Sequence, residues 1–204
     1  MSKYPIIIFE GIEASGKTTN FKIAANYLKK RRKSFIKLRE PGGSIFSEKI
    51  RKLILNKKLN LNNKTDLLLF YAGRSENFEK IIKKNYKKKI ILIDRFTDST
   101  IAYQHYGMKI DLKVIKMLNK FIIGNFNPDI VFLSTVNSKN LQKRLRNRSK
   151  LNRYDKFKLN FYNKVQNGYE KISVNKNKYI KINSNTNTIN EVKKIIINKL
   201  EKLI

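Results

Sequence analysis

The chain has 204 residues, of which 41% are hydrophobic, and it carries a formal net charge of +31. This length suits one α/β domain with its own core, and no apolar run approaches the ~20 residues that a membrane-spanning helix needs. The absence of cysteine excludes disulfides, thiolate-bound zinc and thiol catalysis, and a single histidine argues against a histidine-based triad or metal site.

Apolar stretches alternate with segments of helical spacing along the chain. We expect five buried strands, at residues 4–9, 35–38, 90–93, 129–133 and 179–182. We expect helices at residues 17–32, 45–55, 65–85, 98–106 and 112–126, from residue 138 onward, and at 154–174 and 189–203. This alternation predicts a parallel sheet covered by helices on both faces, and ligands of such folds bind where the strands end.

The first expected strand leads into the segment G-I-E-A-S-G-K-T, which matches the P-loop pattern G-x-x-x-x-G-K-[ST] between a strand and a helix. Its glycines let backbone N–H groups turn toward phosphate oxygens, Lys17 would reach the β- and γ-phosphates, and Thr18 can ligate Mg²⁺. The alternative is a fortuitous glycine-rich turn. The residues expected to contact the nucleotide are Gly11, Ile12, Glu13, Ala14, Ser15, Gly16, Lys17, Thr18 and Thr19.

Two further polar turns follow expected strands. Asp94 ends the third strand, where a carboxylate after a P-loop usually holds Mg²⁺ or its waters, and Arg95 can bridge the phosphates of donor and acceptor. Arg39 and Glu40 follow the second strand in a rigid turn closed by Pro41. The alternatives are a strand-terminal ion pair and a turn of solvated charges. Because parallel strands end at one edge, we expect both turns to lie beside the P-loop.

Two helical faces carry groups that can read a base. Phe70 and Arg74 are four residues apart, so a ring that stacks and a cation that donates to a carbonyl share one face. Thr100 and Gln104 have the same spacing, with Tyr103 beside them, and they can complete the hydrogen bonding to a base edge. The alternative for Phe70 is core packing, since three leucines precede it.

Four arginines, at positions 144, 146, 148 and 153, lie in or near a charged break in the helical pattern. A mobile segment of this kind can close over a nucleotide and stabilise charge in the transition state, and the alternatives are a solvated charge run or an RNA-binding face. A nearby match to the guanine-reading N-K-x-D motif, at residues 63–66, opens a helix instead of following a buried strand, so we interpret it as chance.

The net charge permits two interpretations. A basic surface can bind nucleic acid by releasing counterions, but the excess here is almost all lysine, spread along the chain among many asparagines and isoleucines. Such drift is typical of an AT-rich genome. We therefore expect no nucleic-acid partner, although the positive field would still speed encounter with anionic nucleotides.

Taken together, these motifs closely resemble bacterial-type thymidylate kinases, in the order of that family and over nearly the whole chain. The matching segments are F-E-G-I-E-A-S-G-K-T-T (9–19), R-E-P-G-G (39–43), E-K-I-R (48–51), L-L-L-F-Y-A-G-R (67–74), D-R-F-T-D-S-T-I-A-Y-Q (94–104), P-D-I-V-F-L (128–133) and F-Y-N-K-V-Q-N-G-Y (161–169). The resemblance implies a P-loop three-layer sandwich with about five parallel strands, a single domain over residues 1–204, and a lid at about 145–156. It also implies Mg²⁺-dependent transfer of the ATP γ-phosphoryl group to dTMP and a homodimer. Independently of the resemblance, the lack of cysteine and of a signal-peptide pattern leads us to expect a cytoplasmic location.

The resemblance also implies roles for individual residues. Phe70 would stack on thymine while Arg74, Thr100 and Gln104 bond its edge, Tyr103 would disfavour ribonucleotides, Glu13 would meet the 3′-hydroxyl, and Arg39, Arg51 and Arg95 would approach the acceptor phosphate. Thr18 and Asp94 would hold the metal. The implied catalytic residues are Lys17, Arg95 and a lid arginine, which is either Arg148 or Arg153. Asn152 departs from the family, where many members have aspartate before the lid arginine.

Two other functions stay open at this point. One is a P-loop phosphotransferase with a different nucleotide or nucleoside acceptor, and the other is a basic NTPase that nucleic acid stimulates. A decayed nucleotide binder is disfavoured because Lys17, Thr18, Asp94 and Arg95 are all present.

Overall fold

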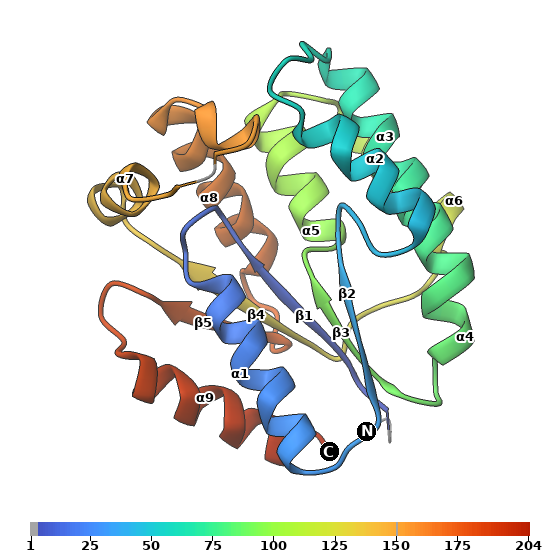
Figure 1. The fold of residues 1–204 in the computed structure, drawn as a ribbon, viewed down its shortest axis with the longest axis vertical. Coiled ribbons are helices and arrows are strands. Elements are labelled where there is room, and N and C mark those ends of the chain that lie inside the picture. The colour runs from blue at the N-terminus through green and yellow to red at the C-terminus, as the bar shows by residue number, and fades with distance from the viewer. Residues whose placement is uncertain (1–3, 150) are drawn as a thin grey trace.

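A computed structural model describes residues 4–149 and 151–204 (Figure 1). Its five strands are β1 (Ile6–Gly11), β2 (Phe35–Arg39), β3 (Ile90–Asp94), β4 (Ile130–Thr135) and β5 (Tyr179–Asn183). They form one parallel sheet in the order β2-β3-β1-β4-β5. The predicted α/β class and five-stranded parallel sheet are therefore confirmed.

The helices lie between and after the strands. They are α1 (Lys17–Lys30), α2 (Ile45–Leu55), α3 (Asn63–Asn77), α4 (Lys83–Asn85), α5 (Thr97–Thr100), α6 (Leu112–Ile123), α7 (Ser138–Arg146), α8 (Leu159–Ser173) and α9 (Ile189–Glu201). Two π-helical segments, η1 (Phe78–Ile82) and η2 (Ile101–Gly107), continue α3 and α5, and η3 (Tyr154–Lys156) is one 3₁₀ turn. Within the described residues, no helix is long and apolar enough to cross a bilayer.

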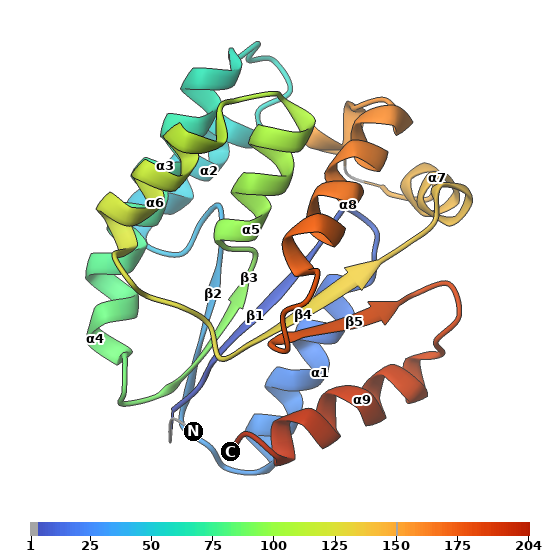
Figure 2. The same ribbon diagram turned by 180° about the vertical axis from the view of Figure 1, so that it is seen from behind.

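Alternating side chains of β1 supply both halves of the core. Ile7 and Phe9 point to the face that α1 and α9 cover, while Ile6 and Ile8 point to the face that η1 and α6 cover. Figure 2 shows α5, α6 and α8 on the second face, with α1 and α9 behind the sheet. Both faces of β1 are therefore buried, and this burial fixes the register of the strand and the position of the loop at its end.

The largest differences from the expected helix boundaries lie in α3 and before α8, while α1 and α6 end two and three residues earlier than expected. The helix expected at 65–85 begins at Asn63, because the side chain of Asn62 caps it by accepting from the Thr65 N–H, and it changes to the π-helix η1 at Phe78. The continuous helix expected at 154–174 is wrong. The Tyr154 carbonyl accepts from the Tyr162 hydroxyl at 2.6 Å, and the chain is extended after η3, so α8 starts only at Leu159.

Candidate active site

The P-loop occupies the turn between β1 and α1, and its conformation depends on glycine. Gly11 has φ 139°, and a Cβ there would lie 2.4 Å from the Ser134 carbonyl oxygen, so a larger residue would clash with β4. Gly16 has φ 90° directly before α1. The Ser15 hydroxyl donates to the Ile12 carbonyl at 2.8 Å and closes the loop. A loop of this shape before a helix is an arrangement in which backbone N–H groups can bind an anion.

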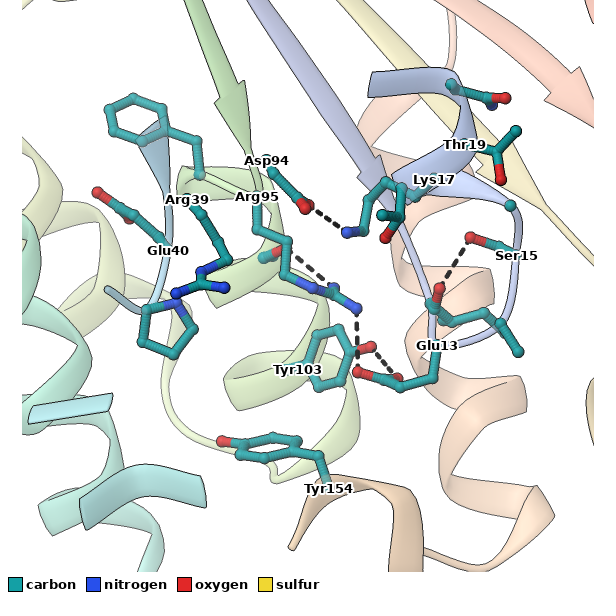
Figure 3. Close-up of a pocket in the computed structure, with 18 of the residues that line it drawn as sticks. Glu13, Ser15, Lys17, Thr19, Arg39, Glu40, Asp94, Arg95, Tyr103 and Tyr154 are labelled. Atoms are coloured by element: carbon teal, nitrogen blue, oxygen red, sulfur yellow. Dashed lines mark hydrogen bonds and ion pairs between the residues drawn. The ribbon is translucent and has the colours of Figure 1, made fainter. Parts of the chain in front are cut away.

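Lys17, the first residue of α1, is buried and forms an ion pair with Asp94 at the end of β3 (Figure 3). Burial lowers the pKa of Lys17 and the nearby positive charge of Arg95 adds to this effect, whereas Asp94 acts in the opposite direction. The structure thus brings together the predicted phosphate-binding lysine and the predicted metal-binding carboxylate. Thr18, the other predicted metal ligand, is exposed beside them on the wall of the same cavity.

Arg95 is held in the turn after β3 with φ 68°, and its backbone N–H donates to the Phe9 carbonyl at 3.0 Å. Its guanidinium donates to Glu13 at 2.9 Å and lies 5.1 Å from the centroid of the Tyr103 ring. The Tyr103 hydroxyl donates to the other Glu13 oxygen, and burial raises the pKa of Tyr103 well above its ordinary value, so the hydroxyl keeps its proton. Three residues with predicted roles at the acceptor therefore form one preassembled group (Figure 3).

Arg74 lies deep behind the acceptor side and is only 1% exposed. Its Nε donates to Glu40 at 2.8 Å and an Nη donates to the Phe96 carbonyl at 3.0 Å. Burial raises the pKa of Glu40, and the charge of Arg74 opposes that effect. Within the described residues, Glu40 Oε1 and Thr100 Oγ1 are buried oxygens with no hydrogen-bond partner, and both residues line the cavity. Such oxygens are suited to a ligand that supplies the missing partner.

The other predicted phosphate contacts sit at the mouth of the site. Arg39 donates to Glu48 at 2.9 Å, and Arg51 donates to the Pro41 carbonyl at 2.6 Å. Both arginines line the cavity with Arg95, so three guanidinium groups from separate segments face one space. The predicted convergence of the turns after β1, β2 and β3 is therefore seen in the structure.

The four arginines in and near the expected lid take different positions. Arg144 joins α7 to the P-loop, donating to the Ala14 carbonyl and to the Ser184 hydroxyl, both at 2.9 Å. Arg148 lines the cavity and pairs with Asp155. Arg153 points elsewhere: it donates to the Ile54 carbonyl at 2.9 Å and pairs with a buried aspartate of α3. Arg146 is exposed and off the cavity wall, and residue 150 of the lid lies outside the described residues.

One cavity of about 680 Å³ holds this whole arrangement. The predicted residues on its wall are Ile12, Glu13, Ala14, Ser15, Gly16, Lys17, Thr18, Thr19, Arg39, Arg51, Phe70, Arg74, Asp94, Arg95, Thr100, Tyr103, Gln104 and Arg148. Gly11 and Arg153 are the predicted site residues that do not line it. The cavity extends from the P-loop to Phe70.

Sequence reasoning missed Glu10, which is completely buried beneath the site in β1. It accepts from the Phe96 N–H at 2.8 Å, from the Ser99 hydroxyl at 2.6 Å and from the Tyr169 hydroxyl at 3.0 Å. Burial and the negative charge of Asp98 raise the pKa of Glu10 to about 7. An acidic residue inside an apolar strand, next to the P-loop, was the signal available in the sequence.

Comparison with known proteins agrees with this geometry. The sequence profile of the family described as thymidylate kinase matches residues 9–196. The thymidylate kinase of Thermosipho africanus (strain TCF52B) is 39% identical over 199 residues, which cover 96% of this chain and 98% of the relative. That of Ehrlichia ruminantium (strain Gardel) is 39% identical over 206 residues, covering 97% and 98% of the two chains.

A solved structure extends the similarity to three dimensions. The crystal structure of thymidylate kinase from Ehrlichia chaffeensis superimposes with a TM-score of 0.77 at 35% sequence identity, covering 97% of this chain and 98% of that one. Sequence and fold agree over nearly the full length, and the P-loop lies within the matched region. This chain therefore belongs to the thymidylate kinase family.

Proposed function

We propose that the chain transfers the γ-phosphoryl group of ATP to dTMP, yielding ADP and dTDP, within the cavity described above. The observation that supports this most directly is that Lys17 of the P-loop and the pair Phe70 and Arg74 line one continuous space. ATP would place its phosphates in the P-loop, and dTMP would place its base near Phe70 and its phosphate near Arg95.

The donor side would act through charge and position. Lys17 and the start of α1 would neutralise the β- and γ-phosphates. Thr18 and Asp94 supply a hydroxyl and a carboxylate, the hard oxygen ligands that Mg²⁺ prefers, and two protein ligands suffice because this ion retains waters and phosphate oxygens. When bound, Mg²⁺ would neutralise charge that develops on the transferring phosphate.

The acceptor side would need no general base. The 5′-phosphate of a nucleotide has a second pKa near ~6, so it is largely a dianion at neutral pH and can attack directly. Arg39, Arg51 and Arg95 would hold that dianion in line with the donor. Glu13 would accept from the 3′-hydroxyl of the sugar, and the Tyr103 ring would crowd a 2′-hydroxyl and so disfavour ribonucleotides.

For the lid, we propose Arg148 as the arginine that stabilises charge in the transition state. It lines the cavity and its side chain is 43% exposed, so it can move onto a nucleotide, whereas the guanidinium of Arg153 is only 15% exposed and is engaged by Asp66. Arg153 then has a positioning role.

The test is an ADP-release assay with Mg·ATP and a panel of acceptors: dTMP, dUMP, dCMP, UMP, AMP, GMP, thymidine and single-stranded DNA. We expect a strong preference for dTMP. Lys17→Met should abolish turnover while leaving the fold intact, and Lys29→Met, in the last turn of the same helix, is the matched control. Near-normal activity of Lys17→Met would refute the P-loop assignment, and stimulation by DNA alone would favour a nucleic-acid-dependent NTPase.

We also propose that a second copy of the chain covers the face formed by α2, α3 and α6, which lie together on one side of the molecule (Figure 1). This face exposes large apolar side chains, namely Ile45, Phe46, Leu53, Leu68, Met117 and Phe121. Phe121 is 85% exposed, which is unfavourable in water for a side chain of its size. Sedimentation velocity should give the mass of a dimer, and a monomer at micromolar concentration would contradict the proposal.

A further inference from the structure

A buried carboxylate behind the base site connects three elements. Asp66 lies in the first turn of α3, and its side chain is 1% exposed. It accepts hydrogen bonds from the Arg153 guanidinium and the Tyr154 hydroxyl, and from the Gln104 amide nitrogen at 3.4 Å. These donors come from the expected lid just before η3, from η3 itself and from η2. The residue belongs to the N-K-x-D segment that the sequence analysis set aside as a chance match.

Each hydrogen bond around Asp66 can run in only one direction. Arg153 balances the charge of the carboxylate, which can then only accept hydrogen bonds. The Tyr154 hydroxyl gives its single proton to Asp66, and burial raises the pKa of Tyr154 well above its ordinary value, so it keeps that proton. The Tyr154 oxygen therefore accepts, and it lies 3.3 Å from the Gln104 Nε2. Both neighbours of the Gln104 amide thus require its NH₂ group.

This requirement sets the direction of the other half of the amide. Because an amide group is planar, directing Nε2 toward Asp66 and Tyr154 turns the carbonyl oxygen Oε1 away from them. Gln104 lines the cavity one helical turn from Thr100. The Tyr154 ring packs edge-on against Phe70 and Tyr103, with centroids 6.1 and 5.7 Å apart. The Asp66 cluster is therefore directly behind the wall that would face the base.

We infer that Asp66 is a positioning residue that sets base specificity: it holds the Gln104 amide so that only an acceptor, Oε1, is offered to the base. An acceptor suits thymine and uracil, which carry an N–H at N3, and it opposes cytosine, whose N3 is itself an acceptor. This inference rests on the proposed function, since it assigns the base pocket to a pyrimidine monophosphate. Arg74 would add discrimination at position 4 of the ring independently.

The test is Asp66→Asn, which keeps the size of the side chain but offers an NH₂ group, so the Gln104 amide can reverse. Calorimetric binding of dTMP, dUMP and dCMP is measured with wild type and variant, together with KM for ATP. We expect dTMP affinity to fall about tenfold, the scale of one buried hydrogen bond, with an equal loss for dUMP. Affinity for dCMP should hold or rise, so the preference for dTMP over dCMP contracts by at least tenfold, while KM for ATP is unchanged.

Two further variants separate specificity from general damage. Phe70→Ala removes stacking, which every base shares, so it should weaken dTMP and dCMP equally and leave their ratio unchanged. Tyr154→Phe keeps the ion pair of Asp66 with Arg153 and removes only the hydroxyl, and it decides the matter if Asp66→Asn does not fold. In Tyr154→Phe we expect the preference for dTMP over dCMP to fall by only about threefold, because Asp66 still orients the Gln104 amide.

Equal losses for dTMP and dCMP in a folded Asp66→Asn protein, or in Tyr154→Phe, would overturn the inference and leave Asp66 a purely structural residue. A wild-type protein that binds dCMP as tightly as dTMP would also overturn it. Failure of the proposed function would look different, because wild type would then bind dTMP selectively without phosphorylating it, or would not bind it at all.

Discussion

Glu10 carries a prediction about stability and pH that follows from its burial. Its side chain accepts hydrogen bonds from Phe96, Ser99 and Tyr169, but the surrounding core opposes a negative charge. The pKa rises from its ordinary value near 4.5 to about 7 in the folded protein. In the unfolded chain, the same group would titrate at its ordinary value.

The sign of the effect follows from proton counting. Between pH 4.5 and 7 the folded protein holds a proton on Glu10 that the unfolded chain has released. Raising the pH therefore favours unfolding by about 1.4 kcal/mol per pH unit, and over the whole interval the free energy of unfolding falls by about 3 kcal/mol. The stabilising contribution is fully present below pH 4.5 and is lost as the pH rises through 7.

The assay is urea unfolding of wild type and Glu10→Gln at half-unit steps from pH 5 to 8. Glutamine imitates the protonated acid, so the two proteins should differ little at pH 5, and the variant should become progressively more stable than wild type up to pH 7.5. Glu79→Gln, which removes an exposed carboxylate from η1, controls for the change in net charge. A constant difference between wild type and Glu10→Gln across the range would refute the reasoning.

Three other substitutions test the site. Phe70→Ala should weaken dTMP binding by about 1–3 kcal/mol, the scale of base–aromatic stacking, and spare ATP; equal calorimetric losses for both nucleotides would indicate a core role instead. Arg148→Ala should lower kcat by about 10²–10³ with little change in melting temperature, as expected for a donor that acts on the transition state. Arg153→Ala should instead lower the free energy of unfolding by about 3 kcal/mol, because it leaves the buried Asp66 unpaired. A loss of kcat in Arg153→Ala together with a loss of thermal stability in Arg148→Ala would show that the two roles are exchanged.

The sheet and the position of the site could be predicted from the sequence because both depend on local patterns. Apolar runs predict five strands, and parallel strands end at one edge of the sheet. The motifs that follow β1, β2 and β3 must therefore lie together at that edge. The P-loop needs only its own glycines and the strand and helix beside it, so its pattern is sufficient.

What the sequence could not supply were the partners of buried polar groups, because those come from distant segments. Between η3 and α8 the chain is extended at Phe157, and the Tyr162 hydroxyl of α8 reaches back to donate to the Tyr154 carbonyl of η3. Glu10 acquires its environment from residues about 90 and 160 positions away. Neither contact follows from spacing along one element.

The choice between Arg148 and Arg153 shows how such a partner determines function. The two arginines are five residues apart in a charged segment, and their types and spacing are equivalent in the sequence. Asp66 is buried in α3 and must be paired, since an isolated charge there would be strongly destabilising. Arg153 meets that requirement, so its guanidinium is fixed behind the proposed base site, and Arg148 is left on the cavity wall. In the proposed mechanism, the need to neutralise one buried carboxylate would thus assign the two arginines to different tasks, with Arg153 holding the base pocket in shape and Arg148 available to the phosphates.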